Sequence, residues 1–298
     1  MPDFGIMRGF NEKLFGDKLV AGQLPTQLGL IGSESVGFIG ILDLYPNAAI
    51  AYSLRKLRSA YTGSAIRVRR SSDNAESDIG FTSGGDLDTA ALTSFCGSGN
   101  GFVTTWYDQS TGGNNLTQTT AANQPQIVSS GSVITNLGGK PTCQFDGTKY
   151  IYKNWSLNLS QPYTNISVNR YASLTLPTDF PYIMRSEFGV DTNLSLLGAL
   201  SGDNRMFNGA NLFHSLSPAI NTNYLWFGIP NTSLTINNVT TTGNSGGAPL
   251  VGGIVLGTYN GTIGGLNGFL SEQIIYSGSK SSDQTGIQNN INTYYGIY

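Results

Sequence analysis

The chain has 298 residues, of which 11% are charged, and a formal net charge of -2. This length suits one large all-β domain with a short additional segment, and the weak net charge gives no electrostatic reason to expect a nucleic-acid partner. Few charges together with 39 glycines favour many short strands and turns over long surface helices.

The N-terminal residues lack the basic start and apolar run of a secretion signal, and no apolar run reaches the roughly 18 residues of a membrane span. We therefore expect a soluble protein without a signal peptide or membrane contact, made in the cytosol. Cys96 and Cys143 are expected to be reduced and buried, with a disulfide as the less favoured alternative. His214 is the only histidine and nothing near it has ligand spacing, so no zinc site is predicted.

Residues 1–39 consist of short apolar pieces separated by glycines. Phe4, Phe10 and Leu14 are among the side chains that make this segment too apolar for a solvated tail. We predict an extended anchoring segment over residues 1–39, which packs against another chain and makes a homo-oligomer, and a β domain over residues 40–298. A flexible leader is the alternative.

A short helix is predicted from Pro46 or Asn47 to about Ser59, because apolar residues recur there at helical spacing: Ile50, Leu54, Leu57 and Tyr61. A second helix is predicted from Leu87 to Phe95, capped by Asp86.

Between these two segments, Ile66 to Arg70 alternates like a strand. Six of the chain's 16 basic residues lie between Arg55 and Arg70. They form either an anion or acidic-glycan patch or a solvated face that nearby carboxylates neutralise in part, and we favour the second interpretation. The carboxylates in question are Asp73, Glu76 and Asp78.

The most informative stretch is Gly101-Phe-Val-Thr-Thr-Trp-Tyr-Asp-Gln-Ser-Thr-Gly-Gly-Asn-Asn-Leu-Thr-Gln118. Its first half alternates with large groups on both faces, which predicts a central strand, and the pattern stops at Asp108 before a polar loop. The Asp108 carboxylate is expected to accept hydrogen bonds from loop amides or from Ser110. A calcium ion held by Asp108 and the loop asparagines is a less favoured alternative, and no other cofactor is expected.

From Gln126 onward, short apolar segments recur at intervals of roughly 8 to 12 residues, which is typical of a sandwich. Two buried strands are predicted at residues 252–257 and 268–276, and Ser281 to Gln284 opens a last helix with a capping-box pattern. The predicted intermediate strands lie near residues 127–128, 133–134, 142–145, 150–152, 165–174, 180–184, 194–200, 224–228 and 233–239.

Residues 107–118 resemble the "YDQSGNGNHLTQ" segment in the catalytic domain of fungal type B α-L-arabinofuranosidases. The segments 51–63, 66–73 and Phe95-Cys96 follow that family's corresponding segments in the same order. Similar blocks occur in laminin G-like proteins of environmental bacteria and their phages. The resemblance implies an all-β, concanavalin A-like jelly-roll sandwich with a few short helices.

An enzyme of this kind needs two carboxylates that flank the scissile bond. The resemblance places the acid/base in a Gly-Gly-Asp loop, where this chain has Thr258-Tyr-Asn-Gly261 without an acidic residue. Glu187 and Asp191 lie in roughly the nucleophile region but lack the flanking motif. On these grounds we expect no hydrolysis of an aryl arabinofuranoside, and an arabinofuranosidase-like glycoside hydrolase remains the alternative.

Sugar recognition uses aromatic faces beside amides and hydroxyls. The candidate ligand-binding residues are Asp108, Asn114, Asn115, Trp155, Tyr259 and Asn260. The competing interpretation is that these residues make turns and fill the core. The sequence-based expectation is thus a non-enzymatic phage virion protein, a fibre, decoration or tail-associated protein located on the particle, which binds other virion proteins through residues 1–39 and host-surface or environmental glycans through its jelly roll.

Overall fold

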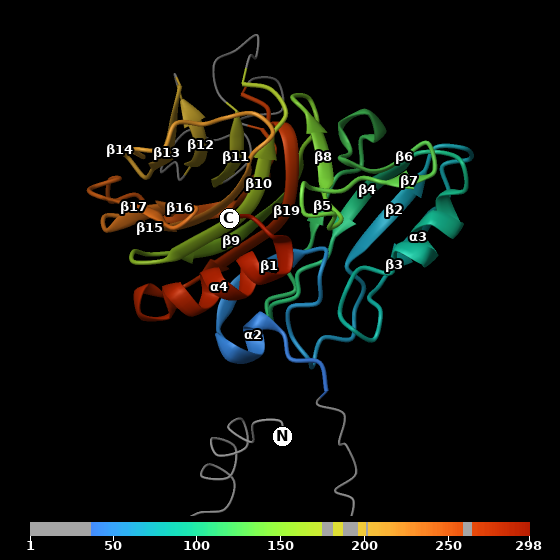
Figure 1. Ribbon diagram of the computed structural model, residues 1–298, viewed down its shortest axis with the longest axis horizontal. Coiled ribbons are helices and arrows are strands. Elements are labelled where there is room, and N and C mark those ends of the chain that lie inside the picture. The colour runs from blue at the N-terminus through green and yellow to red at the C-terminus, as the bar shows by residue number, and fades with distance from the viewer. Residues whose placement is uncertain (1–36, 175–180, 187–195, 201, 259–263) are drawn as a thin grey trace, which may run out of the picture. The chain divides into compact units, whose positions relative to one another are not determined.

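The computed structural model describes residues 37–174, 181–186, 196–200, 202–258 and 264–298 (Figure 1). Residues 38–298 form one compact unit. The anchoring segment predicted over residues 1–39 falls almost entirely outside the described residues, so its role and the domain boundary at residue 40 stay predictions.

One antiparallel sheet folds back on itself into two layers, the all-β sandwich that the sequence predicts (Figure 1). The first layer has the order β17-β16-β15-β10-β19, with β1 and β8 both paired to β19. Its strands are β1 (Ala48–Ser53), β8 (Cys143–Asp146), β10 (Thr164–Tyr171), β15 (Asn223–Ile229), β16 (Ser233–Ile236), β17 (Val239–Thr242) and β19 (Asn267–Tyr276).

The second layer has the order β9-β18-β11-β12-β13-β14. Its strands are β9 (Ile151–Leu159), β11 (Tyr182–Ser186), β12 (Leu196–Leu200), β13 (Asp203–Phe207), β14 (Asn211–Phe213) and β18 (Leu250–Leu256). The two layers are joined through β6, β4 and β5. The joining strands and their neighbours are β2 (Ile66–Arg70), β3 (Glu76–Ile79), β4 (Gly101–Trp106), β5 (Leu116–Thr117), β6 (Gln126–Ser129) and β7 (Ser132–Val133).

The last helix, α4 (Gln284–Tyr295), covers the outer face of the first layer. Its buried Ile287, Ile291 and Tyr295 pack against apolar residues of β10, β15 and β19, as the periodicity predicts. The predicted capping box does not form, because the 3-10 turn η2 (Ser281–Asp283) precedes the helix and no side chain caps it. No helix in the described part of the chain is long and apolar enough to cross a membrane.

The helix predicted from residue 46 or 47 to Ser59 is wrong, because β1 occupies this segment and pairs with β19. Ile50 and Tyr52 face the space between the layers, whereas Ala48 and Ala51 belong to the core under α4. A strand buried on both faces has no polar side, so its apolar residues also satisfy helical spacing. Before α4, the described α-helices are α2 (Ile41–Leu44) and α3 (Thr89–Cys96). Asp88 and not the predicted Asp86 caps α3, by accepting a 2.9 Å hydrogen bond from the Ala91 N–H group.

Ion pairs neutralise the basic segment in part, as the favoured interpretation predicts. On the surface, Arg67 pairs with Asp78 at 2.8 Å and Arg70 with Asp73 at 2.7 Å. Arg55 instead lies in the interior and pairs with Glu272 at 2.8 Å. Cys96 and Cys143 are both free and buried, and burial raises the pKa of both thiols.

Candidate functional site

The Asp108 carboxylate is saturated by protein donors. Its Oδ1 accepts hydrogen bonds of 2.9 Å from the backbone N–H groups of Ala51 and Ser110. Its Oδ2 accepts from the Ser110 hydroxyl and the Asn114 N–H group, also at 2.9 Å. The predicted hydrogen bonding of this carboxylate is confirmed, and it ties the loop to β1.

The residue after Asp108 holds the same two segments together. Gln109 is fully buried, and its amide nitrogen donates to the carbonyl groups of Ser53 and Arg55 at 2.9 Å while its amide oxygen accepts from Leu57 N–H at 2.8 Å. The Asn115 amide oxygen accepts from the Asp108 N–H group at 3.0 Å. The motif that carries the family resemblance therefore holds β1 and the residues after it in place. Its side chains bind backbone groups of residues 51–57 that do not pair with a neighbouring strand on this side.

Calcium has little to bind in this loop, because four donors already occupy the Asp108 oxygens. Among the described residues, no group of three or more His, Cys, Asp or Glu side chains is placed to hold a metal ion. The cofactor expectation stays a prediction that a chelator can test.

The other predicted site residues are only partly located. The structure brings Asp108, Asn114 and Asn115 together in one loop, whereas Trp155 lies on β9 and its side chain is outside the described part. Tyr259 and Asn260, and the carboxylate candidates Glu187 and Asp191, are outside the described residues. Their assignment to a ligand-binding or catalytic site stays a prediction.

Sequence reasoning missed a polar row on the inner face of the first layer. Ser167 of β10 lies directly opposite Trp226 of β15 and Gln273 of β19. Opposed residues of antiparallel strands share a face, and Trp226 belongs to the core between the layers while Phe227 belongs to the core under α4. The row therefore faces the second layer, although all three side chains are fully buried.

This row carries hydrogen-bonding atoms that the protein does not use. Within the described chain, Ser167 Oγ, Trp226 Nε1, Gln273 Oε1 and both amide atoms of Asn169 have no hydrogen-bond partner. Each such buried group costs about 1–3 kcal/mol. The signal was the alternation of Asn165, Ser167 and Asn169 with apolar residues, a pattern that normally indicates a strand face in contact with water.

A second unpredicted cluster lies on the second layer and is positively charged. Arg205 of β13 donates to the Tyr182 hydroxyl at 3.0 Å and to the Asn211 amide oxygen at 2.6 Å, and is 6% exposed. Arg185 of β11 is fully buried, and its Nε donates to the Ser186 carbonyl at 3.0 Å. Burial raises the pKa of Tyr182, and the neighbouring arginines oppose this shift.

The positive charge of these two guanidinium groups can stabilise the ionised form of a carboxylic acid that lies close to them. A nearby positive charge favours the ionised form of a carboxylic acid and lowers its pKa. Glu187 follows Arg185 by two residues in the sequence. The cluster thus puts fixed positive charge on the strand that leads into the segment with the sequence-predicted carboxylates.

A part of the first half of the chain matches known proteins in sequence. The family model described as "Alpha-L-arabinofuranosidase B, catalytic" matches residues 44–148. A probable α-L-arabinofuranosidase B of Aspergillus flavus is 40% identical over 97 residues, which cover 30% of this chain and 19% of that protein. An α-L-arabinofuranosidase of Hypocrea jecorina is 39% identical over 95 residues, with the same two coverages. The matches therefore span about a fifth of each relative's own length.

Solved structures extend the likeness across most of the domain. A mutant α-L-arabinofuranosidase soaked with 4-nitrophenyl α-L-arabinofuranoside aligns with a TM-score of 0.67 and 18% identity, over 86% of this chain and 64% of that one. An arabinofuranosidase complexed with arabinofuranosyl-α-1,2-xylobiose aligns with the same TM-score and coverages at 19% identity. At these identities the likeness establishes the sandwich fold, as the sequence predicts.

These findings correct the functional expectation. The prediction of a non-enzymatic phage virion protein, located on a phage particle, is wrong, because the matching family model is that of a catalytic domain and the matching relatives are fungal arabinofuranosidases, not virion components. The findings support the alternative, a glycoside hydrolase. The prediction failed because it gave more weight to a missing acidic residue in one loop than to the motifs of the first half of the domain.

Proposed function

We propose that this chain is a glycoside hydrolase of the α-L-arabinofuranosidase type. The match of residues 44–148 to an arabinofuranosidase catalytic-domain model carries the proposal. The sandwich fold, similar to arabinofuranosidases over 86% of the chain, is consistent with it. The proposed substrate is a terminal α-L-arabinofuranosyl group, and the reaction is hydrolysis of its glycosidic bond.

The chemistry requires one carboxylate that attacks or activates water and one acid that protonates the leaving oxygen. Glu187 and Asp191, outside the described residues, are the sequence candidates for the ionised carboxylate. Arg185, two residues before Glu187 in the sequence, would favour the ionised form of a carboxylate that lies beside it, since a nearby positive charge lowers the pKa of an acid. In this proposal, the buried positive charge of the second layer contributes to catalysis by keeping the reacting carboxylate ionised.

The test is release of 4-nitrophenol from 4-nitrophenyl α-L-arabinofuranoside by the purified chain and by Glu187→Gln and Asp191→Asn. Loss of the attacking carboxylate should reduce kcat by at least about 10³-fold in one variant. The matched control is Asp203→Asn, which removes an exposed carboxylate from β13 and should leave kcat unchanged. Absence of turnover by the parent would refute the proposed function. Equal turnover by the parent and the three variants would refute the assignment of the carboxylate to Glu187 or Asp191.

A further inference from the structure

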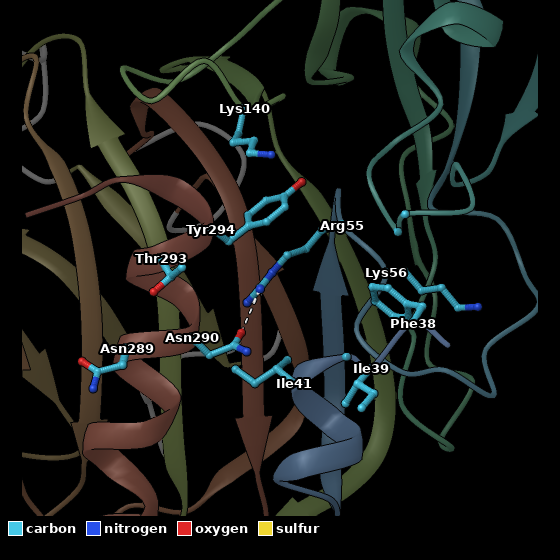
Figure 2. A pocket seen from close by; sticks show the side chains of 13 residues that line it. Phe38, Ile39, Ile41, Arg55, Lys56, Lys140, Asn289, Asn290, Thr293 and Tyr294 are labelled. Carbon is cyan, nitrogen blue, oxygen red and sulfur yellow. Dashed lines mark hydrogen bonds between the residues drawn. The ribbon is translucent and has the colours of Figure 1, made fainter. Parts of the chain in front are cut away.

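A pocket with a volume of about 560 Å³ lies where the start of the domain, the end of β1 and helix α4 meet (Figure 2). Figure 2 shows Arg55, Asn290 and Tyr294 on one side and Phe38, Ile39 and Lys56 on the other. This volume is in the range of small-ligand sites. Arg55 and Lys56 belong to the basic segment considered above as an anion or acidic-glycan patch, whereas none of the six candidate ligand-binding residues contributes to the lining.

The floor of the pocket holds a buried guanidinium with unused donors. Arg55 is 7% exposed and has five N–H groups. Two of them bind Glu272, from Nε at 2.8 Å and from one terminal nitrogen at 3.0 Å, and a third binds the Asn290 amide oxygen at 2.9 Å. Among the described residues no acceptor takes the other two N–H groups of this guanidinium, whose central carbon lies 4.8 Å from the centre of the Tyr294 ring.

The two carboxylates beside the pocket, Glu272 and Asp86, are both paired with protein donors. Glu272 is fully buried and also accepts from the Ser53 hydroxyl at 2.7 Å and from the Tyr295 hydroxyl at 3.2 Å. Asp86 accepts from Lys140 at 3.1 Å and from the Tyr294 hydroxyl at 2.6 Å. The pocket thus presents donors, and a complementary ligand must present acceptors.

Charge selects the kind of acceptor. Arg55, Lys56 and Lys140 line the pocket, and Glu272 and Asp86 neutralise two of these three cations, which leaves an excess of one positive charge. This excess matches a monoanion better than a dianion such as phosphate. The apolar wall of Phe38 and Ile39, the latter 56% exposed, suits the C–H face of a sugar ring.

We propose that this pocket binds a sugar acid, a pyranose ring with a single carboxylate such as a uronic acid residue. The carboxylate would meet N–H groups of Arg55 and the ammonium group of Lys140, while Lys56, whose ammonium group points away from Arg55 in Figure 2, adds positive charge at the rim. The amide of Asn289 and the hydroxyl of Thr293, both exposed on α4, would meet the ring hydroxyls. Binding there requires no hydrolysis, so the proposal stands apart from the proposed enzymatic function.

The experiment is a calorimetric titration with sodium D-glucuronate at low ionic strength. Lys140→Gln should weaken binding by about tenfold, the effect of roughly one lost charge-assisted contact, and Lys56→Gln should weaken it less, because the Lys56 ammonium group points away from Arg55. The matched control is Lys149→Gln, because Lys149, like Lys140, pairs with an aspartate at 3.1 Å but lies outside the pocket. Thermal melts of all variants check that each one is folded.

Two further ligands separate a sugar-acid site from other possibilities. Methyl β-D-glucopyranoside keeps the ring without the carboxylate, and inorganic phosphate keeps a charge without the ring; both should bind at least about tenfold more weakly than glucuronate. Phosphate binding as tight as glucuronate binding would overturn the assignment to a sugar acid. No glucuronate binding, equal binding of the neutral glucoside, or an equal loss in Lys149→Gln would overturn the site itself.

Discussion

Asp108 is the residue on which the loop of the best-matched segment depends. Asp108→Ala would leave three donors without an acceptor, the N–H groups of Ala51, Ser110 and Asn114, and would leave the Ser110 hydroxyl only the Ala49 carbonyl at 3.3 Å. Asp108→Asn keeps one oxygen and so loses fewer of these bonds. At about 1–3 kcal/mol for each buried donor left unpaired, we expect Ala to lower the thermal midpoint clearly more than Asn.

Thermal melts of the parent and both variants, with and without chelator, make this measurement. If the loop held calcium, chelator would destabilise the parent alone, contrary to the saturated geometry. Equal stability of the three proteins would show that the carboxylate does not organise this end of the sandwich.

His214 makes the folding stability depend on pH in a defined direction. Burial lowers the pKa of His214 below its ordinary value of 6.5, and the ring nitrogen Nδ1 accepts a 2.9 Å hydrogen bond from the Leu216 N–H group. Because the unfolded chain takes up this proton more readily than the folded one, stability is complete above the unfolded pKa and falls as the pH decreases through it.

His214 is the chain's only histidine, so the effect can be isolated. Urea unfolding at pH values of about 7.5 and 5.5 should show that His214→Gln loses less stability on acidification than the parent. The same loss in both proteins would assign the pH dependence to carboxylates instead.

At the scale of elements, two buried serines on strands of the first layer offer a matched comparison. Ser53 of β1 donates to Glu272 at 2.7 Å, whereas Ser167 of β10 has a hydroxyl without a partner in the described chain. Both are fully buried. Ser53→Ala removes a hydrogen bond to a charged group and should destabilise by about 1.5–3 kcal/mol, while Ser167→Ala removes an unsatisfied group and should be neutral or stabilising.

Urea unfolding of the two alanine variants decides this comparison. A large loss of stability in Ser167→Ala would mean that its hydroxyl is satisfied, for example by an ordered water, and the inner row would then be a hydrated part of the core.

The same elements show what local patterns can predict. Strands with one apolar face, such as β2, and the amphipathic helix α4 follow from periodicity, because water lies on one side of them. For β1 the pattern gave a helix instead of a strand, and for β10 it gave the strand but not the burial of its polar side, since both sides of each strand are covered once α4 and the second layer pack. Which side of a strand is exposed to water depends on the elements that pack against it. A window of ten residues does not include those elements, so it cannot predict the exposed side.

For the whole molecule, the sandwich was predictable and the candidate site was not. The Asp108 loop was recognised as a motif because its residues are close in the sequence, and its side chains hold β1 in place. Its part in ligand binding stays a prediction. The polar row joins Ser167, Trp226 and Gln273 from three strands, and the pocket of Figure 2 joins Phe38, Arg55 and Tyr294. Such sites arise only when distant segments meet, so their residues have no spacing that a sequence pattern can detect.

The enzymatic proposal leads to a prediction about leaving groups. The loop at residues 258–261, which the family resemblance assigns to the acid/base, has no acidic residue. A 4-nitrophenolate leaves without protonation, whereas an alkoxide does not, and general acid catalysis contributes about 10²–10⁴-fold. We therefore expect kcat/KM to be far larger for 4-nitrophenyl than for methyl α-L-arabinofuranoside.

Asn260→Asp should raise hydrolysis of the methyl glycoside more than that of the aryl glycoside. Asn238→Asp, in an exposed turn between β16 and β17, is the control. Similar kcat/KM values for both substrates in the parent would show that another residue supplies the proton.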